Sequence, residues 1–176
     1  MKWRRGVPQI CQPHQLTAGG VQALEYLLPG FRDEVLSLGG VDLDLARHVH
    51  YFDHGSSYPS FDSNLRGLGV SRPFLEQCLR ERVYRDLGTK LDVIQDVMMD
   101  MELQEGEIGG VVLKRLGLVP CDVYVDAAGK KSILPELLHK HGYGRPRKIS
   151  VDAKIKSVSR LVKIPEAFSK ARPSIL

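Results

Sequence analysis

The stretch Ser71-Arg-Pro-Phe-Leu-Glu-Gln-Cys-Leu-Arg-Glu-Arg-Val83 contains the clearest helix pattern in the chain. Ser71 is a favourable N-cap, because its hydroxyl can accept a hydrogen bond from a free N–H of the first turn. Pro73 suits that turn, where its missing N–H costs nothing. Apolar residues follow at helical spacing as far as Val83, and Gly88 ends the pattern. The sequence therefore predicts a helix that begins at Ser71 and ends at Gly88.

Helices and strands are also predicted on the N-terminal side of this helix. Residues 18–28, with Thr17 as N-cap, place apolar side chains on one helical face and end at Pro29-Gly30. A second short helix is predicted over residues 31–38. Alternating apolar and polar residues predict a strand. The segments predicted as extended are residues 7–13, 47–52 and 61–70, with a turn at residues 54–59.

The C-terminal side is predicted to be richer in strands. Residues 91–103 are apolar enough for one or two strands, and residues 108–114 form another after a turn at 104–107. Together they predict a β-meander. Further elements are a short strand at 121–125, a turn at 126–132, a helix at 133–141 and a long alternating strand at 148–164.

Size and composition are those of an ordinary folded protein. The chain has 176 residues, of which 43% are hydrophobic and 26% are charged, as expected for one domain. No apolar run approaches the roughly 18 residues that a membrane helix needs, and the N-terminus does not resemble a secretory signal. The three cysteines are far apart, which disfavours a disulfide framework or a thiolate zinc site. We therefore expect a cytoplasmic location.

The net charge of +4 is distributed unevenly. From residue 144 onward there are nine basic and two acidic residues, while the first 143 residues have 16 basic and 19 acidic ones. Such asymmetry is typical of a nucleic-acid-binding tail, or of a strand with a charged solvent face. The lysines alternate with Ile, Val and Ala and no aromatic residues are interleaved, so we expect no nucleic-acid partner.

Two short patterns have both a chemical and a structural interpretation. His48 and His50 would share one face of a strand, which allows a metal site with Asp53 and His54, or a plain strand edge. Residues 67–69, Gly-Leu-Gly, hold two glycines of a dinucleotide loop, but the pattern favours a plain turn. We predict no metal site.

Asp126-Ala-Ala-Gly129, which follows the predicted strand at 121–125, is more informative. Small residues after a strand let backbone amides approach an anionic ligand closely. The Asp126 carboxylate can accept a hydrogen bond from a ribose hydroxyl, or it can hold an Asx-type turn. Both interpretations remain open from the residues alone.

Several segments, in this order, resemble FAD-dependent monooxygenases and epoxidases of the aromatic-hydroxylase type. Ser71-Arg-Pro-Phe-Leu-Glu76 resembles the family's SRP-x-LE helix, and Val123 to Ser132 resembles its DLVVDATGRGS segment. The other similar segments are Arg4–Gln9, His14, Gly19–Glu25, Leu28–Gly30, Arg80–Val83, Leu137–Tyr143 and Ser159–Glu166.

The chain also departs from the family pattern. The family's N-terminal Gly-x-Gly-x-x-Gly unit and its C-terminal Gly-Asp motif are absent. Ala128 and Lys130 replace the Thr and Arg of the Asp motif, and lysine lacks the planar fork of arginine. Of residues 10–14, only His14 matches the family pattern. We therefore expect a truncated form of such a protein.

The resemblance implies an α/β fold with α+β character: a partial FAD-binding domain with a β-meander, plus part of a substrate-domain β-sheet. We expect one incomplete FAD/NAD(P)-binding-like domain over residues 1–176. Residues 1–46 and 71–143 would form its flavin part, and residues 47–70 and 144–176 its substrate sheet.

By the same resemblance, Arg72, Asp126 and Gly129 would bind FAD, and NADH or NADPH would serve as reductant. The implied activity is oxidation or oxygenation of a small organic substrate, and no catalytic residue can be named. The alternatives are a non-catalytic remnant or interaction module and, less favoured, a nucleic-acid binder that uses the basic C-terminal segment. The sequence does not indicate an oligomeric state.

Overall fold

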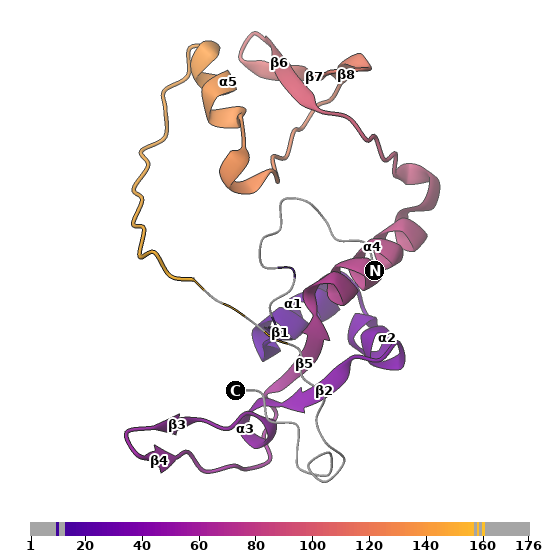
Figure 1. The fold of residues 1–176 in the computed structure, drawn as a ribbon. Coiled ribbons are helices and arrows are strands. Elements are labelled where there is room, and N and C mark those ends of the chain that lie inside the picture. Colours follow the sequence, from indigo (N-terminus) through magenta and orange to yellow (C-terminus); the bar gives the residue numbers. More distant parts are fainter. Residues whose placement is uncertain (1–9, 11–12, 157, 159, 161–176) are drawn as a thin grey trace. The chain divides into compact units, whose positions relative to one another are not determined.

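The computed structural model describes residues 10, 13–156, 158 and 160, which form two compact units (Figure 1). The first unit holds the described residues up to Lys90 together with Lys156, Val158 and Arg160, and the second runs from Leu91 to Ile155. The flavin and substrate-sheet sub-regions expected from the family resemblance stay a prediction. Every strand pairing among the described residues is antiparallel, which places the fold in the α+β class.

A three-stranded antiparallel sheet forms the centre of the first unit. Strands β1 (Pro13–Leu16) and β2 (Val41–Asp44) flank the central β5 (Arg66–Ser71). His14 lies opposite Val70, and Asp42 lies opposite Leu68. The strand predicted over residues 61–70 therefore exists, but it begins five residues later.

The helices of this unit are α1 (Ala18–Leu27), α2 (Phe31–Ser37), α3 (Leu45–His48) and α4 (Arg72–Leu87), and the 3-10 turn η1 (Gly88–Lys90) follows α4. One buried cluster joins α1, α2 and α4 to β5, and its members are Val21, Phe31, Val35, Leu68, Val70 and Cys78. The predicted helices at 18–28, 31–38 and 71–88 are confirmed to within a few residues.

The cap predicted at Ser71 is present. The Ser71 hydroxyl accepts a hydrogen bond from the Phe74 N–H at 3.4 Å, and Pro73 lies in the first turn. Gly88, with φ of 50°, is the C-cap of α4. Local sequence thus sets both ends of the longest helix described.

The strand predicted over residues 47–52 is wrong, because Asp44 starts a helix instead. Its carboxylate accepts hydrogen bonds from the Ala46 and Arg47 N–H groups, as an N-cap does. The following residues form the single turn of α3. An isolated bridge at Val49 and the small hairpin of β3 (Phe52–Asp53) and β4 (Ser56–Ser57) come after it. The predicted turn at 54–59 covers the tip and second strand of that hairpin.

The second unit contains the predicted β-meander. Strands β6 (Met98–Gln104), β7 (Glu107–Leu113) and β8 (Gly117–Pro120) pair in that order. Glu105 and Gly106, both with positive φ, form the turn between β6 and β7. The meander is followed by the 3-10 turn η2 (Gly129–Lys131) and by α5 (Leu134–Lys140). Residues 91–97 form no regular element.

Two further predicted strands are wrong within the described residues. Residues 121–125 have no strand partner, and neither do residues 148–156 with Val158 and Arg160. Alternation favours a strand only where a neighbouring strand can pair with it, and these stretches have none in the described part of the chain. The rest of the segment predicted at 148–164, and most of residues 7–13, lie outside the described residues. In the part of the chain that is described, no helix has the length and apolarity to cross a bilayer.

Candidate functional site

The Asp126 carboxylate organises the turn that follows residues 121–125. It accepts a hydrogen bond from the Ala128 N–H at 2.9 Å and another from the Ser132 hydroxyl. These two donors, Ser132 first, lower the pKa of Asp126, so the group is a carboxylate at neutral pH. The contact from residue 126 to residue 128 is the Asx-type turn that was one of the two interpretations of this segment.

The far side of this turn is open around Gly129. Gly129 has φ of +68°, and a Cβ built on it would meet no atom within 4 Å. Lys130 and Lys131 follow it in η2, and both are exposed. The Ser132 hydroxyl then accepts from the Leu134 N–H at 3.0 Å, which ties the turn to the start of α5. A ligand can therefore approach the backbone at Gly129, next to two cations.

Arg72 is the first residue of α4, directly after β5. Its Nε donates to Glu76 Oε1 at 2.8 Å, one helical turn further on, and its side chain is 40% exposed. The two terminal nitrogens of the guanidinium form no hydrogen bond to another described residue. Arg72 is therefore oriented by Glu76 while its terminal nitrogens remain available to an anionic group.

The predicted site residues fall into two groups. Asp126 and Gly129 share one turn of the second unit, and Arg72 lies in the first unit. The structure thus brings two of the three together.

The histidine pair does not form the arrangement that a strand would give. His48 is the last residue of α3, and its Nδ1 accepts from the Asp44 N–H at 3.0 Å. The described residues contain no group of three or more His, Cys, Asp or Glu side chains able to hold a metal ion. His48 therefore stabilises the start of α3 within the described structure.

The sequence interpretation missed Asp44, a buried carboxylate residue that is 1% exposed. Its carboxylate accepts from the Ser63 hydroxyl at 2.6 Å and from the Ser63 N–H at 2.7 Å. With the α3 amides, these bonds lower the pKa of Asp44 to about 2. An Asp that precedes a short apolar-polar run is an N-cap pattern, but the alternation of residues 47–52 obscured it.

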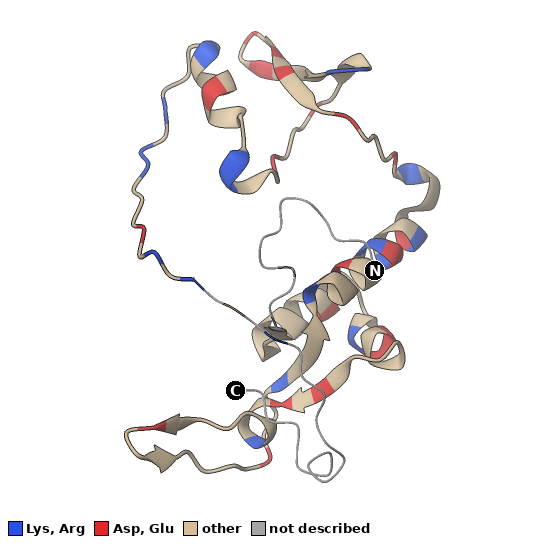
Figure 2. Ribbon diagram, in the orientation of Figure 1, with Lys and Arg blue, Asp and Glu red and all other residues tan. Residues whose placement is uncertain are grey.

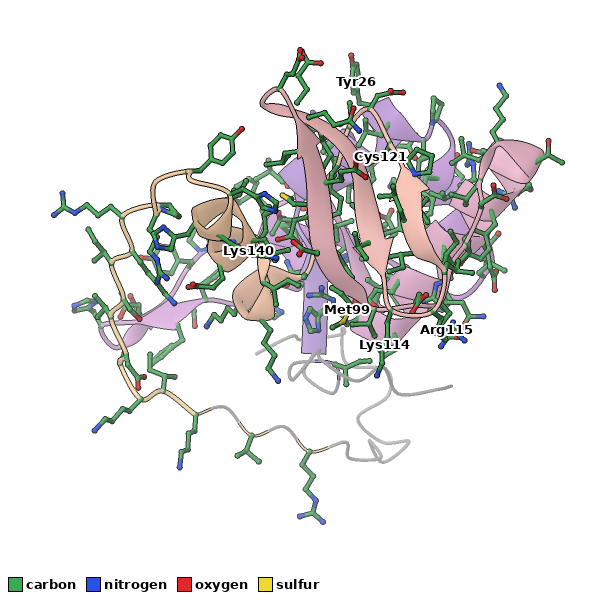
Figure 3. The ribbon with its side chains drawn as sticks, turned by 90° about the horizontal axis from the view of Figure 1, so that it is seen from above. Tyr26, Met99, Lys114, Arg115, Cys121 and Lys140 are labelled. Atoms are coloured by element: carbon green, nitrogen blue, oxygen red, sulfur yellow. The ribbon has the colours of Figure 1, made fainter. Side chains whose placement is uncertain are left out.

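Two carboxylates of the second unit were missed as well. Asp96, whose side chain is 2% exposed, accepts from the Arg115 and Leu116 N–H groups at 3.0 and 3.2 Å. Asp100 on β6 pairs with Lys140 of α5, and Lys140 is labelled in Figure 3. Asp96 therefore closes the turn that follows β7, and Asp100 ties α5 to the meander.

Comparison with known proteins gives one distant relative. The chain is 28% identical over 180 residues to Protein Rv3254 of Mycobacterium tuberculosis, and the alignment covers 94% of this chain. The chain spans 38% of the length of that relative. No protein-family model matches the sequence.

Proposed function

We propose that this chain is part of an FAD-dependent, monooxygenase-like oxidoreductase and that it contributes to the flavin site through Arg72, Asp126 and Gly129. The observation that carries the proposal is the turn from Asp126 to Ser132. It combines an ionised carboxylate, a glycine with open space around it, and two exposed lysines. The ordered resemblance of the sequence segments supports the same cofactor.

The groups in this turn match the chemistry of a dinucleotide. Each Asp126 oxygen accepts one hydrogen bond within the turn and retains a lone pair for a ribose hydroxyl. The glycine lets a pyrophosphate approach the backbone without meeting a side chain. Lys130 and Lys131 supply positive charge beside it. The residues present therefore fit a phosphate-bearing cofactor.

Arg72 has a complementary role in this proposal. Its Nε is held by Glu76, so less side-chain freedom is lost when the terminal nitrogens bind a phosphate oxygen. The role of Glu76 is to orient the guanidinium, and we assign it no contact with the cofactor.

Bound FAD would supply the redox chemistry, with NADH or NADPH as electron donor and a small organic molecule as substrate. The residues of this chain would bind and orient the cofactor. No side chain of the described structure is assigned as a general acid or base.

Titration of the purified chain with FAD, followed by flavin fluorescence, tests the proposal. We expect saturable binding with one FAD per chain. Arg72→Ala should raise the dissociation constant about 10- to 100-fold, because it removes a charged hydrogen-bond donor. Arg80→Ala, a change of an exposed arginine on the same helix, should leave the constant unchanged.

The Asp126 turn has its own matched pair of variants. Asp126→Asn should weaken FAD binding about tenfold, since an amide is a poorer acceptor for a ribose hydroxyl. Asp122→Asn, an exposed aspartate four residues earlier, should have no effect. Absence of FAD binding by a chain with the expected circular dichroism spectrum would overturn the proposal.

An interaction module without catalysis is the second candidate, and the exposed aromatic residues around the β3–β4 hairpin favour it. Tyr51, Phe52, Tyr58 and Phe61 are between 59% and 72% exposed. Exposed clusters of this kind mark sites where another molecule packs. A folded chain that binds no FAD would make this the leading interpretation.

A further inference from the structure

The segment from Arg145 to Lys156, here called the basic segment, is strongly cationic. It contains five basic residues and one acidic residue, a formal charge of +4. Basic residues dominate the extended stretch after α5 (Figure 2). Arg145 pairs with Glu136 through both of its terminal nitrogens. The other cations of the basic segment form no ion pair with a described residue, and they are Arg147, Lys148, Lys154 and Lys156.

The basic segment also exposes large apolar side chains. Ile149 is 77% exposed, Val151 is 88% exposed and Ile155 is 83% exposed. Ile149 and Val151 lie two positions apart, so an extended backbone places them on one face, with Lys148 and Asp152 on the other. Lys154, with φ of 52°, turns the chain before Ile155, the third exposed aliphatic residue. Within the described residues no strand pairs with this segment. The combination is a basic, amphipathic stretch whose apolar face is in water.

We propose that the basic segment binds peripherally to an anionic lipid bilayer surface. Basic side chains near such a surface are attracted by its negative potential. The aliphatic side chains would enter the boundary between headgroups and acyl chains, as the apolar faces of interfacial segments do. Binding at this site goes beyond the proposed flavin function and does not depend on it.

Charge and residue type favour an anionic lipid surface over a second copy of the chain and over a nucleic acid. A second copy would bring another +4 segment against the first, which electrostatic repulsion opposes. A nucleic acid would satisfy the cations, but binding to its phosphates would leave Ile149, Val151 and Ile155 in water, and the segment has no aromatic residue to stack on bases. A lipid surface engages the cations and the aliphatic residues together.

Co-sedimentation of the full chain with vesicles tests the proposal. The probes are vesicles of pure phosphatidylcholine and vesicles with 30 mol% phosphatidylserine, each in low salt and in 0.5 M NaCl. We expect binding to the phosphatidylserine vesicles at least tenfold tighter than to phosphatidylcholine alone, and a marked loss in high salt. Equal binding to both vesicles, or to neither, would overturn the proposal.

Two triple variants separate charge from apolar contact. Lys148→Glu with Lys154→Glu and Lys156→Glu should abolish vesicle binding. The control, Arg80→Glu with Lys90→Glu and Lys114→Glu, changes the net charge by the same amount at exposed positions elsewhere. It should retain most of the vesicle binding. Equal losses in the two triple variants would contradict a specific role for the basic segment.

Serine variants test the aliphatic face without changing charge. Ile149→Ser with Val151→Ser and Ile155→Ser should weaken vesicle binding at least fivefold. The control, Leu27→Ser with Val93→Ser and Leu116→Ser, replaces exposed apolar residues elsewhere and should leave binding unchanged. The wild-type chain is also tested for binding to an oligothymidylate. Normal vesicle binding by the first serine variant, together with tighter binding of the wild-type chain to the oligothymidylate than to vesicles, would identify a nucleic acid as the partner. The lipid proposal would then fail.

Discussion

The two units of the molecule are stabilised by different kinds of interaction. In the first unit, three helices and the central strand share one buried apolar cluster that includes Phe31 and Leu68, both 1% exposed. In the second, the buried apolar residues among those described are Met101 and Leu137. The second unit depends more on strand pairing, tight turns and the carboxylates Asp96 and Asp100. The Asp126 turn and most of the basic segment lie in this second unit, which has fewer buried residues.

This difference has a functional interpretation. Loops with few buried contacts adapt to ligands more readily than packed helices do. The first unit provides a firm position for Arg72 at the start of α4, and the second provides an open turn. Changes in the two units are therefore expected to have effects of different size.

The largest effect is expected in the core of the first unit. Phe31→Ala should lower the free energy of unfolding by about 3–5 kcal/mol, because it leaves a cavity in the buried cluster. Urea denaturation followed by circular dichroism measures this. Phe52→Ala, at a residue that is 72% exposed, should change the free energy by less than about 0.5 kcal/mol. Equal effects of the two changes would contradict the assignment of the core.

In the second unit, close backbone approach should matter more than apolar volume. A Cβ on Gly110 would lie 2.7 Å from the Val119 carbonyl oxygen, so Gly110→Ala must move β8. We expect a loss of about 1–3 kcal/mol in the same denaturation measurement. At Gly109 the nearest atom, on the Gln104 side chain, is 3.4 Å away, so Gly109→Ala should be nearly neutral. A neutral Gly110→Ala would show that β7 and β8 do not pair closely.

A smaller, pH-dependent effect is expected at Asp44. The pKa of Asp44 is about 2 in the folded chain, below the ordinary aspartate value of 3.8, so the ionised form stabilises the fold. That contribution is complete above about pH 5 and is lost as the pH falls toward 2. In Asp44→Asn, the dependence of unfolding free energy on pH between 4 and 2 should be shallower than in the wild type. Parallel curves would contradict the role given to the Ser63 hydrogen bonds.

The smallest effect is expected for the exposed ion pair of Arg145 with Glu136. Both side chains are more than half exposed, at 57% and 65%. Arg145→Ala should cost at most about 0.5 kcal/mol, and Arg147→Ala should cost nothing measurable. A loss above about 1 kcal/mol for Arg145→Ala would show that this pair stabilises α5 more than an exposed pair does.

Local patterns predicted the helices and the meander well. The cap at Ser71, the glycine at residue 88 and the apolar spacing between them are local, and α4 follows them. The open glycine in the Asp126 turn was also predictable, because small residues and an Asx turn need only their neighbours.

The failures occurred where distant partners decide the structure. Residues 121–125 and 148–156 alternate like strands, yet a strand needs a partner that their own sequence does not specify. Residues 47–52 failed because the Asp44 carboxylate, held by Ser63 from 19 residues away, starts a helix turn. The burial of Asp44 could not be predicted for the same reason.

Amide hydrogen exchange of the chain with and without saturating FAD tests the central claim most directly, because it locates the cofactor on the sequence. We predict slower exchange in peptides that cover residues 126–132 and 71–74, with no change in the β3–β4 hairpin. Unchanged exchange at both places, or protection confined to other parts of the chain, would contradict the flavin site proposed for Arg72, Asp126 and Gly129.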